Sequence, residues 1–151
     1  MKQLLISLFS LLLLQFPLMG ATPFNLEGLK AVNILILDEN DILTPVQEQQ
    51  LKTAIKEKLQ KNGIACKKDG VGAIFLKLHA IALEKSTVIH LTLGVGEEAK
   101  VPRGSEVLSY VLTYSLHEMI KSHDIYKDVY ENSINYLLDD FIEQLEEDNE
   151  Q

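Results

Sequence analysis

The feature that most constrains the fold is residues 28–66, which combine one aliphatic segment with a fully capped helix. Residues 31–37 are nearly all aliphatic, and they are bounded by Lys30 and by an acidic loop at residues 38–41. A short apolar run with such flanks is typical of a β-strand that is covered on both faces. A chain that begins in this way must bury the strand under other elements.

The segment after the acidic loop predicts an amphipathic helix from Pro45 to Asn62. Thr44 is placed as the N-cap, Pro45 stands at the first helical position, and Gln47 completes a capping box. Gly63 is placed to end the helix. One face is expected to be buried, because its apolar residues recur at helical spacing: Leu51, Ala54, Ile55 and Leu59.

The first 21 residues have the features of a secretory signal peptide. Lys2 gives a short positive region, residues 4–16 form an apolar run, and residues 17–21 end in small side chains. The apolar run is short for a membrane span, although an uncleaved anchor in a thin bilayer is the alternative. We therefore expect an exported periplasmic protein that is cleaved near Gly20 or Ala21 and touches the membrane only if the signal is retained.

The expected mature chain is an acidic single domain at residues 22–147. Removing residues 1–21 takes away one charge, that of Lys2, which leaves 13 basic and 22 acidic residues and a net charge of −9. Such a charge disfavours nucleic acid as a partner. Seven acidic residues and no basic one follow Leu138, so residues 148–151 are predicted to form a frayed acidic tail. Six lysines around the first helix are the expected internal or intermolecular complement of the acidic run after Leu138, through a contact or through a long-range field: Lys52, Lys56, Lys58, Lys61, Lys67 and Lys68.

Residues 71–83 and 86–95 predict two strands of a hairpin, with Glu84 and Lys85 as the turn. If Leu83 pairs with Ser86, the residue numbers of every cross-strand pair have the same sum, and one face becomes almost wholly apolar. His79 then lies directly across from His90. The opposite face carries the residues that we expect to form a docking surface: Phe75, Lys77, His79, Ile81, Val88, His90 and Thr92.

The rest of the chain predicts one more strand and a last helix. Residues 106–119 alternate apolar and polar side chains and are rich in β-branched residues and tyrosine, which favours a strand. Asp124 is placed to cap a helix, whose apolar stripe is Tyr126, Tyr130, Ile134, Leu137, Leu138, Phe141 and Leu145.

The element order β-α-β-β-β-α predicts an α+β fold, a two-layer sandwich with a mixed or antiparallel sheet and both helices on one face. The centre of the core should lie between the helices and the hairpin. Six residues are expected to be buried together: Leu51, Ile55, Leu91, Leu93, Leu137 and Phe141.

No constellation of residues predicts catalysis or a cofactor. Residues 94–99 match the loose dinucleotide-binding pattern G-x-G-x-x-A, but no helix is predicted after them, and we interpret them as a hairpin loop. The acidic loop at residues 38–41 lacks the glycine and the distal glutamate of an EF-hand. Cys66 is the only cysteine, which excludes an internal disulfide, and we expect it to be a buried small hydrophobe.

Three stretches resemble a widespread set of small bacterial periplasmic α+β proteins: LEGLKAVNILILDEN at the first strand, KLQKNGI at the end of the first helix, and LLDDFIEQL in the last helix. The element order is also similar to that of the TolB N-terminal domain and of CsgG-like and FlgT-like envelope modules. These resemblances imply protein–protein binding rather than catalysis. Before the last helix, this chain has VLSYVLTYSLHEM in place of the T-W and T-G-S-x-G residues of the first set.

The leading hypothesis is a non-enzymatic periplasmic binding or scaffold module, an accessory of an envelope-spanning machine such as a flagellar motor or a transport complex. Its partner would be an envelope protein or a second copy. A loop or residues 23–29 are alternative covers for the docking surface, which Leu35, Leu37, Val111 and Thr113 would extend.

Two further functions stay open from the sequence. The first is a small metal or ligand binder that uses His79 and His90, although zinc normally takes three or four ligands. The second is an enzyme of unknown activity.

Overall fold

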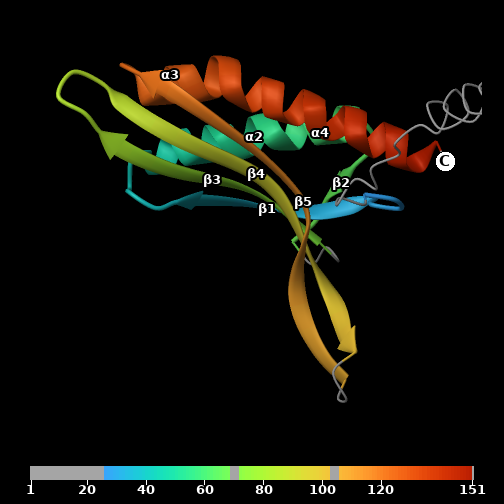
Figure 1. The fold of residues 1–151 in the computed structure, drawn as a ribbon. Coiled ribbons are helices and arrows are strands. Elements are labelled where there is room, and N and C mark those ends of the chain that lie inside the picture. Colours follow the sequence, from blue (N-terminus) through green and yellow to red (C-terminus); the bar gives the residue numbers. More distant parts are fainter. Residues whose placement is uncertain (1–25, 69–71, 103–105, 151) are drawn as a thin grey trace, which may run out of the picture.

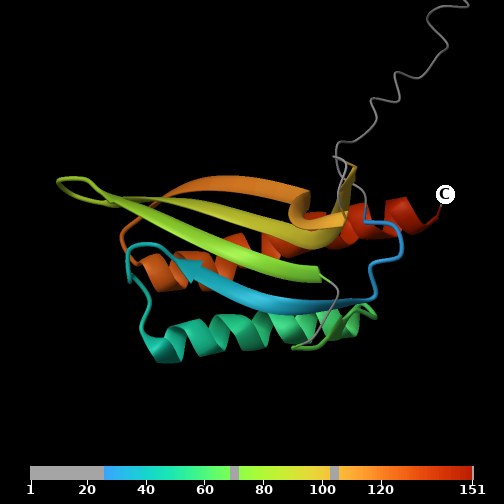
Figure 2. The same ribbon diagram turned by 90° about the horizontal axis from the view of Figure 1, so that it is seen from below.

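A computed structural model describes residues 26–68, 72–102 and 106–150, and the expected signal peptide lies outside these ranges. The described residues form one mixed five-stranded sheet in the order β2-β1-β3-β4-β5. Both long helices lie on the same face of this sheet (Figure 1), and no described element covers its other face (Figure 2). The predicted α+β class and two-layer arrangement are therefore confirmed.

The sheet combines parallel and antiparallel pairing. β1 (Ala31–Asp38) is parallel to both of its neighbours, β2 (Ala65–Cys66) and β3 (Gly72–Ala82). β4 (Thr87–Pro102) is antiparallel to β3 and to β5 (Glu106–Ser122). β2 has only two residues, too few for any alternation to show in the sequence, and it was not predicted.

The first helix, α2 (Pro45–Lys61), begins and ends where the sequence predicts. The backbone N–H of Gln47 donates to Thr44 Oγ1 at 3.3 Å, and Gln47 Oε1 accepts the N–H of Thr44 at 2.8 Å. Gly63, with a φ of 81°, adopts the left-handed conformation that commonly follows a helix. The predicted apolar face points into the core, where its buried members are Leu51, Ile55 and Leu59.

The β3–β4 hairpin has the predicted register over its whole length. Leu78 lies opposite Leu91, His79 lies opposite His90, and the N–H of Leu83 donates to the carbonyl of Ser86 at 2.8 Å. The apolar face of the hairpin packs under the helices. All six residues that were expected to share the core are at most 1 % exposed: Leu51, Ile55, Leu91, Leu93, Leu137 and Phe141.

β1 is covered on one face only, which corrects the prediction of a strand that is buried on both. Val32 is buried, and Ile34 and Ile36 are half-buried on the same side. On the other side Leu35 is 39 % exposed and Leu37 is 43 % exposed. The aliphatic run was misleading because no described element packs against that side of β1.

β4 continues through Gly94 and Gly96, so the hairpin loop predicted for residues 94–99 is wrong. The glycines make room for aromatic rings instead of ending the strand. A Cβ at Gly94 would lie 2.4 Å from the ring of Phe75, and a Cβ at Gly96 would lie 2.9 Å from the ring of Tyr110.

The pairing of β4 with β5 shifts between Val95 and Gly96, as in a β-bulge. Beyond the shift the two strands form an arm, residues 96–102 and 106–112, that points away from the sheet on the side opposite the helices (Figure 1). On the C-terminal side of the shift, β5 continues to Ser122, slightly farther than the predicted end at residue 119.

The C-terminal helical segment has a π-helical turn that was not predicted. It consists of α3 (Ile125–Asp128), the π turn η1 (Val129–Ser133) and α4 (Ile134–Asn149). A π turn holds more residues than an α turn, so it shifts which residues before it face the core. Val129 is therefore buried, whereas Tyr130, which was expected in the stripe, is 37 % exposed.

Both ends of this segment are held by side chains. Asp124 caps α3 as predicted, because its Oδ1 accepts the N–H of Lys127 at 3.1 Å. At the other end, Asp148 Oδ2 accepts the N–H of Leu26 at 2.8 Å, and Asn149 Oδ1 accepts the N–H of Gly28 at 3.0 Å. The prediction of a frayed tail from residue 148 is therefore wrong for Asp148 and Asn149, which anchor the start of the described chain.

The charge complement between the two helices involves Lys58. Its Nζ lies 2.8 Å from Asp139 Oδ1 and donates to the carbonyl of Asn135 at 2.9 Å. This ion pair links α2 to α4, so at Lys58 the complement, which the sequence left open between a contact and a long-range field, is a direct contact.

Candidate functional site

The sheet face turned away from the helices, which we call the open face, carries all seven residues of the predicted docking surface. Side chains alternate along each strand, so the register places them in rows across the sheet. This face is turned toward the viewer in Figure 2. The rows contain Leu35, Phe75, Gly94 and Ser115; Leu37, Lys77, Thr92 and His117; His79, His90 and Met119; and Ile81, Val88 and Lys121.

Large apolar side chains are exposed on several strands of the open face. Leu35 and Leu37 on β1 were noted above, and Ile81 on β3 is 50 % exposed. Met119 on β5 is 70 % exposed, while Phe75 and Val88 are half-buried. The open face is therefore apolar at both ends of β3 and polar between them, which differs from the apolar centre with a polar surround that we expected.

An acidic side chain joins two predicted residues near the centre of the open face. Glu39, which follows β1, has Oε1 2.7 Å from Lys77 Nζ and Oε2 3.0 Å from His79 Nδ1. The hydrogen bond from Lys77 lowers the pKa of Glu39, and His79 lowers it further. With His90 and Thr92 these residues line a shallow cleft of about 250 Å³. Sequence reasoning missed Glu39 because it lies beyond the predicted strand, in the acidic loop.

His117 is a second residue of the open face that the predicted docking surface did not include. Its ring stacks on that of His90, with centroids 5.4 Å apart and planes 18° from parallel. Its Nδ1 lies 3.0 Å from Thr92 Oγ1, and its Nε2 lies 3.0 Å from Ser115 Oγ. Thr92 itself is only 8 % exposed, so little of its side chain is accessible to a partner.

The histidines do not assemble a metal site in the described residues. His79 and His90 are cross-strand partners as predicted, but His79 contacts Glu39 and His90 stacks on His117. No group of three or more histidine, cysteine, aspartate or glutamate side chains in the described ranges could hold a metal ion.

The arm adds exposed apolar side chains beside the open face. Tyr110 is 62 % exposed and Leu112 is 55 % exposed. Val111 and Thr113, which the sequence placed on the docking surface, are half-buried. The register shift explains why Tyr110 and Leu112 are exposed here instead of Val111 and Thr113. Gly96 pairs with Leu112, and Thr113 is left out of the pairing, so the alternation of side chains along β5 changes by one residue.

Two other residues that could have served a functional site, Asp38 and Cys66, have contacts that indicate a structural role. Asp38 in the acidic loop accepts the N–H of Asn40 at 3.2 Å and the N–H of Leu43 at 2.7 Å, so its carboxylate holds the loop in shape. Cys66 is half-buried, with Sγ 4.0 Å from the carbonyl of Lys56. Burial raises the pKa of its thiol, which disfavours the reactive thiolate.

Comparison with known proteins does not identify a family. No protein-family model matches the sequence, and no curated protein matches it. Among solved structures, the chain is similar to a PelC dodecamer from Paraburkholderia phytofirmans, with a TM-score of 0.41 and 13 % identity over 72 % of this chain and 84 % of that chain. Within the described ranges, no helix has the length and apolar character needed to cross a membrane.

Proposed function

We propose that this protein is a non-catalytic binding module of the bacterial periplasm, which docks a protein of the cell envelope through its open face. One observation carries the proposal: four large apolar side chains on the same sheet face, from β1, β3 and β5, are 39 % to 70 % exposed. Single exposed apolar residues are ordinary, whereas a cluster on one face is typical of interaction surfaces. The members of this cluster are Leu35, Leu37, Ile81 and Met119.

Polar groups inside the cluster support docking of a specific partner. Glu39, Lys77 and His79 form one connected group between the apolar residues. Charged groups at an interface contribute to specificity and orientation more than to raw affinity. The arrangement thus combines an apolar area for binding energy with fixed charges that select the partner.

The expected location restricts the class of partner. A chain that is exported by residues 1–21 meets proteins of the envelope or a second copy of itself. We propose a role as an accessory or scaffold of a larger envelope assembly, since the open face offers area for contact and no catalytic arrangement of side chains.

The proposal is tested with aspartate substitutions on the open face. Phe75→Asp, Val88→Asp and Met119→Asp each place a charge among the apolar side chains. Val46→Asp is the matched control, because Val46 is also a large apolar residue, is 68 % exposed and lies on α2, away from the open face.

Each variant is used as bait in an envelope extract with chemical cross-linking, and its self-association is measured by sedimentation. Wild type and the Val46 control should capture the same partner or form the same dimer. The open-face variants should lose it and keep their circular dichroism spectrum. Unchanged capture by Met119→Asp and Val88→Asp, with both proteins folded, would refute docking at this face.

A further inference from the structure

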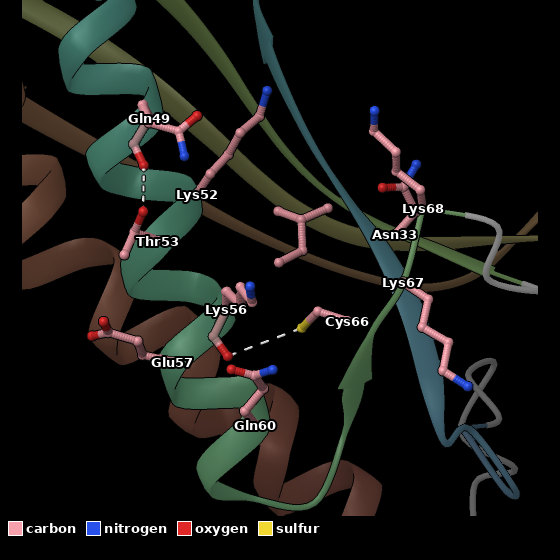
Figure 3. A pocket seen from close by; sticks show the side chains of 11 residues that line it. Asn33, Gln49, Lys52, Thr53, Lys56, Glu57, Gln60, Cys66, Lys67 and Lys68 are labelled. Atoms are coloured by element: carbon pink, nitrogen blue, oxygen red, sulfur yellow. Dashed lines mark hydrogen bonds between the residues drawn. The ribbon is translucent and has the colours of Figure 1, made fainter.

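A groove to which four lysines contribute lies between α2 and β1, at the edge of the sheet (Figure 3). It has a volume of about 380 Å³, and its lining residues come from α2, β1 and the segment around the end of β2. Four of them are lysines and one is acidic, Glu57, in a chain whose net charge is −8. We call this site the lysine groove, after Lys52, Lys56, Lys67 and Lys68.

β1 presents an unpaired backbone edge along this groove. β2 pairs with the first two residues of β1, whereas β3 pairs with β1 from Val32 to Asp38. The carbonyl of Val32 accepts the N–H of Lys67 on the outer side at 2.9 Å. Residues two apart in a strand point the same way, so the N–H and C=O groups of Ile34 and Ile36 also point outward. Within residues 26–68, 72–102 and 106–150, no strand pairs with them there.

The positive charge of the groove is only partly compensated. Lys52 lies 2.7 Å from Glu48 in an ion pair within α2. In the described part of the chain, no ion pair engages Lys56 or Lys68. Figure 3 shows Lys52 extending from α2 and Lys68 beside Asn33, while Lys67 points away from the helix.

We propose that this edge binds an extended acidic segment of a partner protein by strand addition, with the lysine groove receiving its carboxylates. Strand addition to an exposed edge uses main-chain hydrogen bonds for affinity and alternate side chains for specificity. The outward N–H and C=O groups of Ile34 and Ile36 would make the main-chain hydrogen bonds. The lysines would select acidic side chains.

The spacing of the lysines fits a strand better than a compact anion. Lys52 and Lys56 are four residues apart on α2, which separates them by about 6 Å along the helix. Alternate residues of a β-strand are about 6.6 Å apart and project to the same face. Acidic side chains at every second position of an added strand therefore match both lysines at once.

The test uses synthetic peptides with the full chain. The probe is a capped peptide of alternating glutamate and valine. The control peptide has lysine in place of each glutamate. A third peptide keeps the acidic sequence but carries methyl groups on its central backbone amides, which removes its hydrogen-bond donors. Binding is measured by fluorescence anisotropy. The acidic peptide should bind, and the other two should not.

Charge reversal locates the site. Lys56→Glu with Lys68→Glu should weaken binding of the acidic peptide by about tenfold or more. Lys85→Glu with Lys127→Glu changes the net charge equally, at exposed positions outside the groove, and should alter the affinity by less than about twofold. Equal losses in the two double variants would overturn the proposal, because the attraction would then come from net charge alone.

Hydrogen exchange distinguishes strand addition from simple charge attraction. On binding, the amides of Ile34 and Ile36 should exchange more slowly, while those of Leu35 and Leu37, which face β3, should change little. Protection at Ile34 and Ile36 without any peptide, increasing with protein concentration, would assign the edge to a second copy and overturn the proposal. So would absence of acidic-peptide binding, or full binding by the methylated peptide.

Discussion

Gly94 should be unable to accept a side chain while Phe75 is present. A Cβ at position 94 would lie 2.4 Å from Cζ of Phe75 and 2.9 Å from its Cε1, closer than real Cβ contacts come. The ring must therefore move away from the sheet when Gly94 becomes alanine. Phe75 lies on the open face, so the substitution disturbs both stability and the proposed docking surface.

The size of the effect follows from two opposing terms. Overpacking of this kind costs about 1–3 kcal/mol, and replacing a strand glycine with alanine regains about 0.5–1 kcal/mol of chain entropy. Gly94→Ala should then destabilise the wild type by up to about 2.5 kcal/mol. In a Phe75→Ala background the clash is absent, so the same substitution should stabilise the protein by about 0.5–1 kcal/mol.

Urea unfolding followed by circular dichroism on the four proteins of this cycle gives the coupling energy directly. We expect a coupling of about 1–3 kcal/mol between positions 75 and 94. Gly72→Ala is the control, because the atom in its way, 3.0 Å from the added Cβ, belongs to the Glu97 side chain, which can move. A Gly94→Ala effect that is the same in both backgrounds would refute the packing of Phe75 on Gly94.

Three further predictions concern the core, the open face and export. Leu91→Ala and Leu137→Ala remove fully buried side chains and should each cost about 2–5 kcal/mol in urea unfolding, and losses below about 0.5 kcal/mol at both would contradict the packing. Lys77→Met should raise the pKa of Glu39 toward its ordinary value of 4.5 in an NMR titration, since the hydrogen bond from Lys77 lowers it; the stabilisation from this pair is present above the unfolded-state pKa and is lost as the pH falls through the folded-state value. N-terminal sequencing of the protein from its native envelope should return a chain that begins near Thr22, and a chain beginning at Met1 in the membrane fraction would favour an uncleaved anchor.

The predictions that were confirmed rest on local patterns of residues. The cap at Thr44 and the two-residue turn between β3 and β4 are decided by neighbours in the sequence. A two-residue turn also fixes the register of the whole hairpin. The turn at Glu84 and Lys85 was therefore enough to predict that His79 lies opposite His90. The apolar face that this register produces then predicted the core.

The features that were missed depend on contacts between distant residues. A glycine in a strand and a glycine in a loop look the same until Phe75 and Tyr110 are known to cover Gly94 and Gly96. The β4–β5 register could not be counted from a turn, because the bulge shifts it between Val95 and Gly96. His117 was therefore not aligned with Thr92, although both residues were visible in the alternating pattern.

The two proposed binding sites are separate, and this separation gives a final test of both. None of the residues that line the lysine groove is among the residues substituted on the open face, and the groove lies at the β1 edge beside α2, where Asn33 alone of its lining residues on β1 shares the side of Leu35. Substitutions without shared contacts usually have additive effects. Lys56→Glu with Lys68→Glu should leave capture through the open face intact, and Met119→Asp should leave binding of the acidic peptide intact. If each change weakened both activities, one extended partner would have to cross the β1 edge and cover both sites, and the two proposals would become one.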